Sequence, residues 1–532
     1  MERTGAETGR GSGASSGAGS SHGGASSGAG SSHDERHGLE FAGWLRGEPG
    51  SFRELLPANH PPTSWFRPSV LWASRNDRLA HWLRDPTDDE RRRWVAAQRQ
   101  AGVPEDLVVR DHAHLDRVSF MVLGDPGEGD ASQFAVVPAL RAAGAEASFM
   151  VICSDVIYPA GDVNEYMSKF YFPYKDFAAP IYAVPGNHDW YDDLTSFMVH
   201  FCGARPLPPP PRNPARWLSV EWLRQRLWRR PRQMAPAVMA AGQALRPRRE
   251  GFSLQPGPYF AIETGPILLV GIDTGITGGI DADQARWLRK VSTGSAKPKV
   301  LLSGNPLYAD AGRVPGAIEG SSETVDDIVR DPRSNYVAAI GGDRHNYQRY
   351  PVRLPDGRTL QYVVTGGGGA FMHATHNIPR VELDGVDESD FRCYPLRGDS
   401  LSMYANNFGR RRRLRWLRLH PDAAAAVVAT RLGLSPVRNG ARDAQRRASV
   451  SRRARLVASL IATPPIPDRL VQRFFSELFD WDQPPMFKSF LRVDATADEL
   501  RIRCFQATGW LADEQDAPVE DEVRIALGGS GA

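Results

Sequence analysis

The chain has 532 residues, of which 41% are hydrophobic and 24% charged, so it is long enough for one large domain with insertions or for two or three smaller domains. Its formal net charge of +3 is too small to indicate nucleic-acid binding by itself. The four cysteines lie far apart with no CxxC pair, which excludes a disulfide framework and a zinc ribbon and favours a reducing compartment.

The N-terminal segment 1–36 consists mostly of Gly, Ser, Ala and His, and the decapeptide GASSGAGSSH occurs twice, at 13–22 and 24–33. Such a composition has too little apolar surface to bury, so 1–36 is predicted to be a disordered tail. It has no hydrophobic signal core, and no apolar run elsewhere approaches the roughly 20 residues of a spanning helix. The expected location is the cytoplasm.

Three further segments carry helical or basic patterns. Residues 37–115 are predicted to form an N-terminal helical region, in which DERRRWVAAQRQAG (89–102) is typical of a helix that ends at a glycine. Residues 205–250 form an Arg- and Trp-rich insertion, and residues 385–480 a basic helical subdomain. The tryptophans of 205–250 either pack on the core, with arginines that steer an anionic substrate, or lie on an anionic membrane. We favour packing and steering, and we expect this insertion to cover the site described below.

The central segment, 116–384, alternates short apolar runs with helical patterns, which is typical of buried strands in a layered α/β fold. Function in such sheets gathers at the carboxyl ends of the strands. The last segment, 481–532, contains two alternating runs around a turn, which predicts a β-hairpin that completes the core, followed by a tail. The central apolar runs are VSFMVLGD (118–125), ASFMVICSD (147–155), APIYAVPGNHD (179–189), PILLVGID (266–273), KVLLSGNP (299–306) and YVAAIGGDRH (336–345).

Polar side chains follow several of these runs directly. They are Asp125, Asp155, Tyr158, Asn187, His188, Asp189, Asp343 and His345. Together they supply hard oxygen ligands and imidazole, a mixture that suits iron, manganese or zinc better than a soft thiolate metal. Two such ions about 3.5–4 Å apart, bridged by one carboxylate, can clamp the attacking and leaving oxygens of phosphoryl transfer.

Five of these segments occur in order as GDPG, SDVIY, GNHD, GNP and GDRH, and GIDADQARWL (279–288) contains a Q..WL pattern. The sequence resembles the calcineurin-like metallophosphoesterases, and within them the purple acid phosphatase-like branch, over about 118–384 and the closing hairpin. The resemblance implies an α/β fold: a layered β-sandwich of two mixed sheets flanked by helices, with helical insertions. It also implies two divalent or trivalent metal ions (Fe, Mn or Zn) and a hydrolase that attacks a phosphomonoester or phosphodiester with a metal-bound hydroxide.

Matching the motifs residue by residue assigns the metal ligands. Asp125, Tyr158 and His345 would hold the first metal ion, and Asp155 would bridge both ions. A tyrosinate ligand would favour trivalent iron in the first site.

The GNHD motif would serve the second ion and the substrate. Asn187 would bind the second metal and the substrate, and His188 would contact the phosphate and donate a proton, with Asp189 as its orienting partner. Arg349, four residues after His345, is a further candidate for substrate binding.

The second metal site departs from the family pattern. Counting back from Pro306, the position of a ligating histidine holds Gly304, which has no side chain. The first histidine of the GHxH motif is replaced by Asp343, which can still ligate. The second site is therefore expected to be atypical: filled by Mn or Mg, weakly occupied, or absent in a one-metal protein.

Two other functions remain alternatives. A non-catalytic phosphate- or metal-binding module would explain the incomplete second site. A membrane-surface phospholipid phosphoesterase would use the basic, Trp-rich segments for peripheral contact with an anionic membrane. The glycine-rich stretches GDPGEGD and TGGGGAF lack the GxGxxG order and the Lys-Ser/Thr of a P-loop, so neither nucleotide nor nucleic-acid binding is expected.

Overall fold

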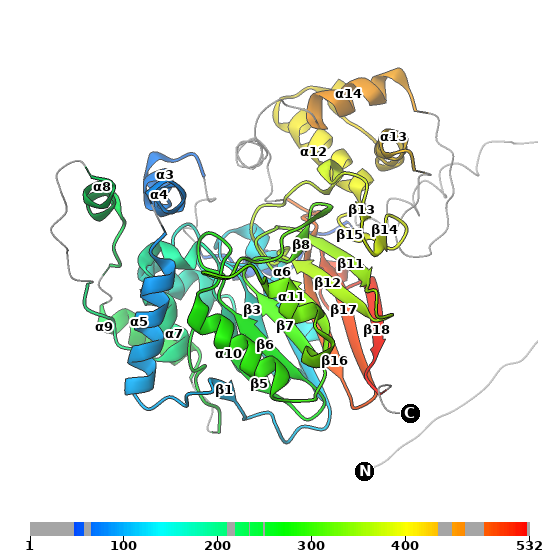
Figure 1. Ribbon diagram of the computed structural model, residues 1–532. Coiled ribbons are helices and arrows are strands. Elements are labelled where there is room, and N and C mark those ends of the chain that lie inside the picture. The colour runs from blue at the N-terminus through cyan, green and yellow to red at the C-terminus, as the bar shows by residue number, and fades with distance from the viewer. Residues whose placement is uncertain are drawn as a thin grey trace, which may run out of the picture. The chain divides into compact units, whose positions relative to one another are not determined.

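The computed structural model describes residues 47–57, 65–83, 85–209, 219–232, 235–247, 251–434, 450–462 and 483–528 (Figure 1). The predicted tail at 1–36 and parts of both Arg-rich segments lie outside these ranges. All described residues belong to one structural unit, Arg46–Ala532. None of the helices within these ranges has both the length and the apolar composition needed to cross a bilayer.

The first sheet has six strands in the order β18-β17-β16-β2-β3-β4. The apolar runs after residue 117 form its parallel part, and the C-terminal hairpin joins it because β16 pairs antiparallel with β2. β3 is fully buried, as expected for a continuous apolar strand covered on both faces. The strands are β2 (Val118–Gly124), β3 (Phe149–Cys153), β4 (Ile181–Val184), β16 (Lys488–Ala495), β17 (Glu499–Ala507) and β18 (Val519–Ala526).

The second sheet has eight strands in the order β1-β5-β6-β7-β10-β12-β11-β15. Its centre, β6-β7-β10-β12, is parallel. β5 pairs antiparallel with β6 and parallel with β1, and β11 pairs antiparallel with both β12 and β15. The strands are β1 (Val108–Val109), β5 (Phe260–Glu263), β6 (Leu268–Ile272), β7 (Lys299–Ser303), β10 (Tyr336–Gly341), β11 (Tyr347–Arg353), β12 (Thr359–Thr365) and β15 (Arg392–Tyr394). Two short ribbons add β8 (Tyr308–Ala309) with β9 (Gly312–Arg313), and β13 (Glu382–Leu383) with β14 (Val386–Asp387).

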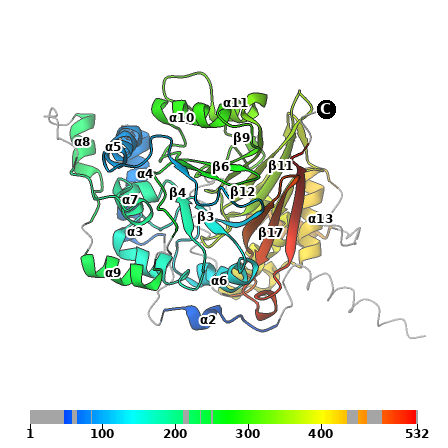
Figure 2. The ribbon, with the colours of Figure 1, turned by 90° about the horizontal axis from the view of Figure 1, so that it is seen from below.

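The two sheets lie between helices. Figure 2 shows α10 (Ala282–Thr293) and α11 (Val325–Arg330) on one side and α6 (Ala131–Ala143) on the other, with strands of both sheets between them. α6 contacts β16 and β17, α10 contacts β6, and β12 contacts β2 and β16 of the other sheet. The predicted α/β class, with two mixed sheets flanked by helices, is confirmed.

Helix α5 (Thr87–Gln100) ties the N-terminal region to the second sheet. The predicted helix at 89–102 lies here, and Gly102, just after it, has a φ of +91°, a backbone conformation that favours glycine. Arg91 of α5 is fully buried and donates to Asp273 (2.8 Å) and Asp281 (2.9 Å), which flank the loop after β6. Asp273 also accepts from the indole of Trp190 in the GNHD segment (2.9 Å), so α5 supports that segment indirectly.

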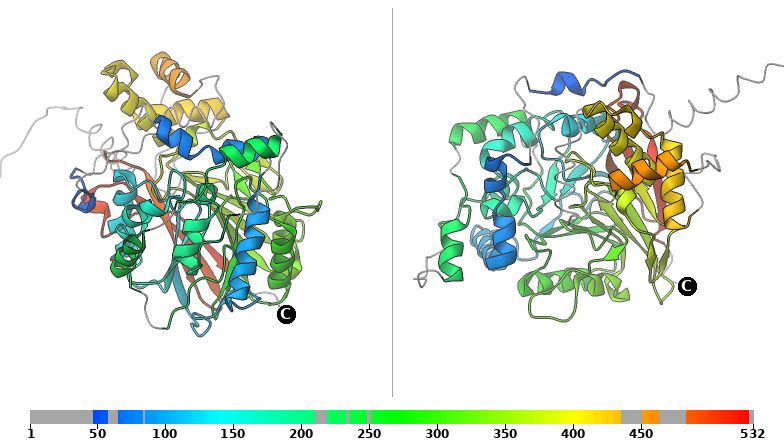
Figure 3. Two further views of the ribbon diagram at one scale, coloured as in Figure 1. Left: turned by 90° about the vertical axis from the view of Figure 1, so that its left-hand side faces the viewer. Right: turned by 90° about the horizontal axis from the view of Figure 1, so that it is seen from above.

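The remaining helices form smaller groups, and Figure 3 shows α12, α13 and α14 as a helical group of their own. The α-helices are α2 (Phe52–Leu55), α3 (Pro68–Ala73), α4 (Asn76–Leu83), α7 (Thr195–Cys202), α8 (Val220–Leu227), α9 (Pro236–Leu245), α12 (Arg397–Arg411), α13 (Pro421–Leu432) and α14 (Arg452–Ala462). The short 3-10 and π turns are η1 (Val163–Glu165), η2 (Met167–Tyr171), η3 (Asp189–Asp192), η4 (Pro332–Ser334), η5 (Thr375–Asn377), η6 (Arg415–Leu417) and η7 (Leu511–Asp513).

Candidate metal centre

A cavity of about 410 Å³ opens where strands of both sheets end. Six of the predicted site residues line it: Asp155, Tyr158, Asn187, His188, Asp343 and His345. They follow β3, β4 and β10, so strand ends from both sheets meet at one place, as the sequence predicts. Asp125, which follows β2, is fully buried and bonded to two of these residues, Tyr158 and Asp343.

The backbone at these strand ends is held in an uncommon conformation. Asp125, Ser154, Asp155 and Asp343 have φ of +52°, +78°, +39° and +63°. Non-glycine residues rarely adopt the left-handed region, and such strain gathers at functional sites. These turns redirect the backbone as it leaves each strand and bring the carboxyl groups of Asp125, Asp155 and Asp343 close to one another.

Asp125, Tyr158 and His345 form a buried cluster. The Tyr158 hydroxyl lies 3.2 Å from Asp125 Oδ1 and 3.0 Å from His345 Nε2. His345 Nδ1 donates to the Phe371 carbonyl at 2.7 Å, so the ring presents the lone pair of Nε2 to the cluster. Three atoms that bear lone pairs therefore share a single hydroxyl proton whenever Asp125 is ionised.

The electrostatics of the cluster favour a cation. Burial, followed by repulsion from Asp155 and Asp343, raises the pKa of Asp125 well above its ordinary value. Burial raises the pKa of Asp155 to about 7, and burial lowers the pKa of His345 well below its ordinary value. A bound cation would stabilise both carboxylates in their ionised form, and the neutral imidazole is the form that ligates metals.

His188 and Asp189 of the GNHD segment make different contacts from those predicted. The His188 N–H donates to Asp155 Oδ1 (2.8 Å), and His188 Nδ1 donates to the Pro159 carbonyl (2.7 Å). The predicted orienting role of Asp189 is wrong, since its carboxylate accepts backbone N–H groups of Gly186, Val156 and Ile157 at 3.0–3.3 Å. Asp189 holds two loops together, and burial raises its pKa to about 8.

Arg349 does not contribute to the cavity as predicted. It lies on β11, and its guanidinium pairs with Asp521 of β18 (Nε–Oδ2 2.5 Å and Nη2–Oδ1 3.0 Å) and donates to Gln361. It is absent from the described residues that line the cavity. Arg349 connects the two sheets through this ion pair, and the prediction that it binds substrate is wrong.

Other cavity residues were missed by sequence reasoning. His373 follows the glycine-rich stretch after β12, stacks on His345 (ring centroids 4.1 Å apart) and accepts from its N–H. Trp65 packs edge-on against Tyr158 and His188, at 5.4 and 5.5 Å between ring centroids. The glycine run before His373 was the one available signal, because Trp65 belongs to a region with no recognisable motif.

The rim of the cavity comes from the N-terminal region and not from the described part of 205–250. Asp77, Arg78, His81 and Trp82 of α4 line the cavity, together with Trp65. The prediction that the insertion covers the site is therefore wrong for its described residues.

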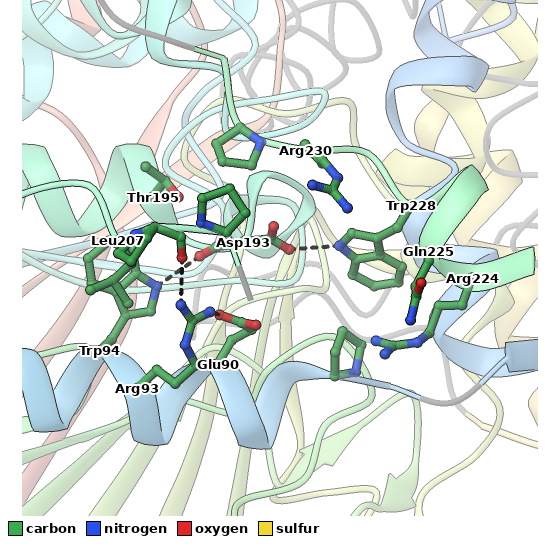
Figure 4. A pocket seen from close by; sticks show the side chains of 14 residues that line it. Glu90, Arg93, Trp94, Asp193, Thr195, Leu207, Arg224, Gln225, Trp228 and Arg230 are labelled. Carbon is green, nitrogen blue, oxygen red and sulfur yellow. Dashed lines mark hydrogen bonds and ion pairs between the residues drawn. The ribbon is translucent and has the colours of Figure 1, made fainter. Parts of the chain in front are cut away.

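The described insertion instead supports the loop that follows Tyr158. Arg229 is buried and donates to Asp162 (2.8 Å) and to the Ala160 carbonyl (2.6 Å). Figure 4 shows a second cavity, of about 190 Å³, where Trp228 donates to Asp193 (2.7 Å) opposite Trp94 of α5. These contacts agree with the packing interpretation of the Arg- and Trp-rich insertion.

Comparison with known proteins identifies the domain that holds this site. Residues 118–347 match the sequence model of the family "Calcineurin-like phosphoesterase". The chain contains a calcineurin-like phosphoesterase domain. No curated protein matches the chain.

Solved structures that match include a purple acid phosphatase from yellow lupin (Lupinus luteus) seeds, with 10% identity, 78% of this chain and 55% of the lupin chain covered, and a TM-score of 0.38. This chain thus spans just over half of the lupin protein. GAP50, the anchor in the inner membrane complex of Plasmodium, matches with 9% identity, 78% and 90% coverage and a TM-score of 0.37. PhoD matches with 10% identity, 78% and 70% coverage and a TM-score of 0.36.

The residues predicted for the first metal site are spaced so that they could hold one ion. Asp125 Oδ1, Tyr158 Oη and His345 Nε2 lie 3.0–3.2 Å apart along the cluster, close to the spacing of about 3 Å between ligands that share an ion at 2.0–2.2 Å. Within the described ranges, no three His, Cys, Asp or Glu side chains come close enough together to hold a metal. A metal ion held here would therefore need the tyrosine oxygen as its third ligand.

The second site of the domain does not fit in the same way. Gly304 supplies no ligand, and Asp343 Oδ2 accepts a hydrogen bond from Arg344 Nη1 at 2.8 Å. Asn187 remains suited to ligation, because its amide nitrogen donates to the Tyr191 hydroxyl (2.7 Å), which leaves the amide oxygen as the atom that could bind a cation. Asp155 and Asn187 are thus the members of the predicted second set that the structure leaves in place.

A histidine introduced at position 304 should not restore the second metal site. A Cβ at Gly304 would lie 2.6 Å from the Pro185 carbonyl oxygen and 3.0 Å from Thr274 Oγ1. We expect Gly304→His to lower the free energy of unfolding by about 1–3 kcal/mol and to add no second equivalent of metal, because the GNHD loop must move. Thermal denaturation and elemental analysis measure both effects. Gly312→His is the control, since a Cβ there meets no atom closer than 3.4 Å; a stable Gly304→His variant with extra metal would contradict this account.

Proposed function

We propose that this chain is a metal-dependent phosphoesterase that hydrolyses a phosphomonoester or phosphodiester at a centre with an atypical second cation position. The observation that supports it most directly is the Asp125–Tyr158–His345 cluster, set beside Asp155 and a cavity of about 410 Å³. That volume is within the range of small-molecule sites, so a phosphorylated small molecule fits. When bound, metal ions would supply Lewis acidity and lower the pKa of a coordinated water.

The chain's own residues supply binding and proton transfer. His188 lines the cavity with its Nδ1 bound to the Pro159 carbonyl, so its Nε2, in the imidazolium form, would donate a proton to the leaving oxygen. Asp155 accepts the His188 N–H and so fixes the position of the proton donor relative to the carboxylates. Asn187 and His188 would contact the phosphate oxygens.

A non-catalytic phosphate-binding module is the second candidate, and the incomplete second site favours it. Trp82 at the rim and Trp72 on the preceding helix α3 are 73% and 59% exposed, and they support peripheral contact with an anionic membrane as a setting for either function. The four cysteines are all buried and free, which supports the proposal of a reducing compartment, the cytoplasm.

Metal removal and reconstitution test the proposal. We expect purified protein to hydrolyse p-nitrophenyl phosphate or bis(p-nitrophenyl) phosphate. Removal of the metal by a chelator should lower the rate of hydrolysis at least about tenfold, and added Fe, Mn or Zn should restore it. With ferric iron, a tyrosinate charge-transfer band should appear and should be absent from Tyr158→Phe. Equal rates with and without metal would reject metal dependence, whereas no hydrolysis with any of these metals would reject an enzymatic function and favour the binding module.

A further inference from the structure

The second cation position has a charged neighbour that the family pattern does not explain. Arg344 is the residue between the two ligand positions of the GDRH motif, in the loop after β10, and it lines the cavity. Its Nη1 donates to Asp343 Oδ2 and its Nε donates to Asp310 Oδ2, both at 2.8 Å. The side chain is 27% exposed, so the guanidinium is partly desolvated between two carboxylates.

The contacts of Arg344 leave donors for a ligand. A guanidinium has five N–H groups, and the two hydrogen bonds to Asp310 and Asp343 use one from Nε and one from Nη1. The others lie in a fixed plane that matches the geometry of phosphate oxygens. Because Asp343 and Asp310 hold the fork on two sides, the remaining donors are oriented before a ligand binds.

The three neighbouring carboxylates also favour a positive group at this place. Asp125, Asp155 and Asp343 are mutually repulsive, and a three-ligand first site neutralises them only in part. A second metal ion would usually complete the neutralisation, yet Gly304 offers no ligand and has no room for one. Arg344 is the positive group that directly contacts Asp343.

We propose that the guanidinium of Arg344 takes the place of the second metal ion: it neutralises Asp343 and binds a phosphoryl oxygen, so that the centre holds one metal ion and one arginine. The proposal deepens the proposed function, since it names the group that would hold the phosphate during hydrolysis. Its prediction for metal content and phosphate binding does not depend on turnover.

The test uses the full-length protein, with elemental analysis and calorimetric titration of inorganic phosphate. We expect one equivalent of metal per chain in the wild type. In Arg344→Ala we expect the same single equivalent and at least about tenfold weaker phosphate binding. Arg344→Lys keeps the charge without the fork, so its affinity should fall between the two. Arg353→Ala is the control, because Arg353 pairs with Asp390 at an exposed site outside the cavity and should bind phosphate as the wild type does.

Each outcome separates the inference from the proposed function. Two equivalents of metal in the wild type, or phosphate binding by Arg344→Ala within about twofold of the wild type, would overturn the role of Arg344. If Arg344→Ala does not fold, the same comparison with Arg344→Lys decides. A wild type with one metal and Arg344-dependent phosphate binding, but no hydrolysis of either aryl phosphate, would support the inference and reject the enzymatic function.

Discussion

We expect Asp155→Asn to lower the hydrolysis of aryl phosphates by roughly 100-fold or more and to leave the protein folded. The amide is isosteric with the carboxylate, and its oxygen can still accept the His188 N–H that lies 2.8 Å from Asp155 Oδ1. What the variant loses is the negative charge next to the metal cluster. The rate constant with p-nitrophenyl phosphate measures this loss.

Thermal denaturation of the metal-free protein supplies a second measurement on Asp155. Because burial raises the pKa of Asp155 to about 7, the ionised carboxylate destabilises the metal-free fold. The protonated form of Asp155 makes the favourable contribution to stability. That contribution is complete below the unfolded pKa of about 4 and disappears as the pH rises through about 7. At pH 8 the metal-free Asp155→Asn variant should therefore be at least as stable as the wild type, whereas added metal should stabilise the wild type more.

A matched surface variant distinguishes the loss of a charge at the metal centre from the effect of removing any carboxylate. Asp390→Asn removes a carboxylate that pairs with Arg353 away from the cavity, and it should hydrolyse substrate at the wild-type rate. Equal rates in wild type and Asp155→Asn would mean that Asp155 has no part in catalysis, and the proposed site would then have to be abandoned.

Arg91→Met lowers the free energy of unfolding by about 3–5 kcal/mol, the largest stability effect that we expect. Arg91 is 1% exposed and contacts Asp273 and Asp281, which are 0% and 1% exposed. Removing the guanidinium leaves two carboxylates buried without their cation, and methionine cannot replace the hydrogen bonds. Denaturant unfolding, with the melting temperature as a second measure, should show the loss.

Arg92→Met is the control for this prediction, because it is the next residue of α5 and has the same chemistry at the surface. Its side chain is 32% exposed and pairs with Asp89 (3.0 Å), so the expected loss is below about 1 kcal/mol. Similar losses in the two variants would show that the buried position of Arg91 is unimportant. Because Asp273 also holds Trp190, Arg91→Met should weaken metal binding as well.

Much of the fold could be predicted because apolar runs with polar ends have few interpretations. The runs that end at Asp125 and Asp155 form adjacent parallel strands, and carboxyl ends of parallel strands meet at one edge. The predictions for Asp189 and Arg349 were wrong for a different reason. Each depends on a partner chosen by the folded chain: loop N–H groups for Asp189, and Asp521, distant in sequence, for Arg349.

The sequence alone determined which kinds of ligand stand at the strand ends, and that Gly304 contributes none, since these facts depend only on residue type and order. The tertiary structure decided which groups face one another. It placed α4 and Trp65 at the rim of the cavity and Arg344 between Asp310 and Asp343. It also placed the Asp189 carboxylate where it accepts hydrogen bonds from two loops. Those contacts depend on how separate elements pack and on the backbone turns that end each strand, and neither is expressed in the local pattern of residues.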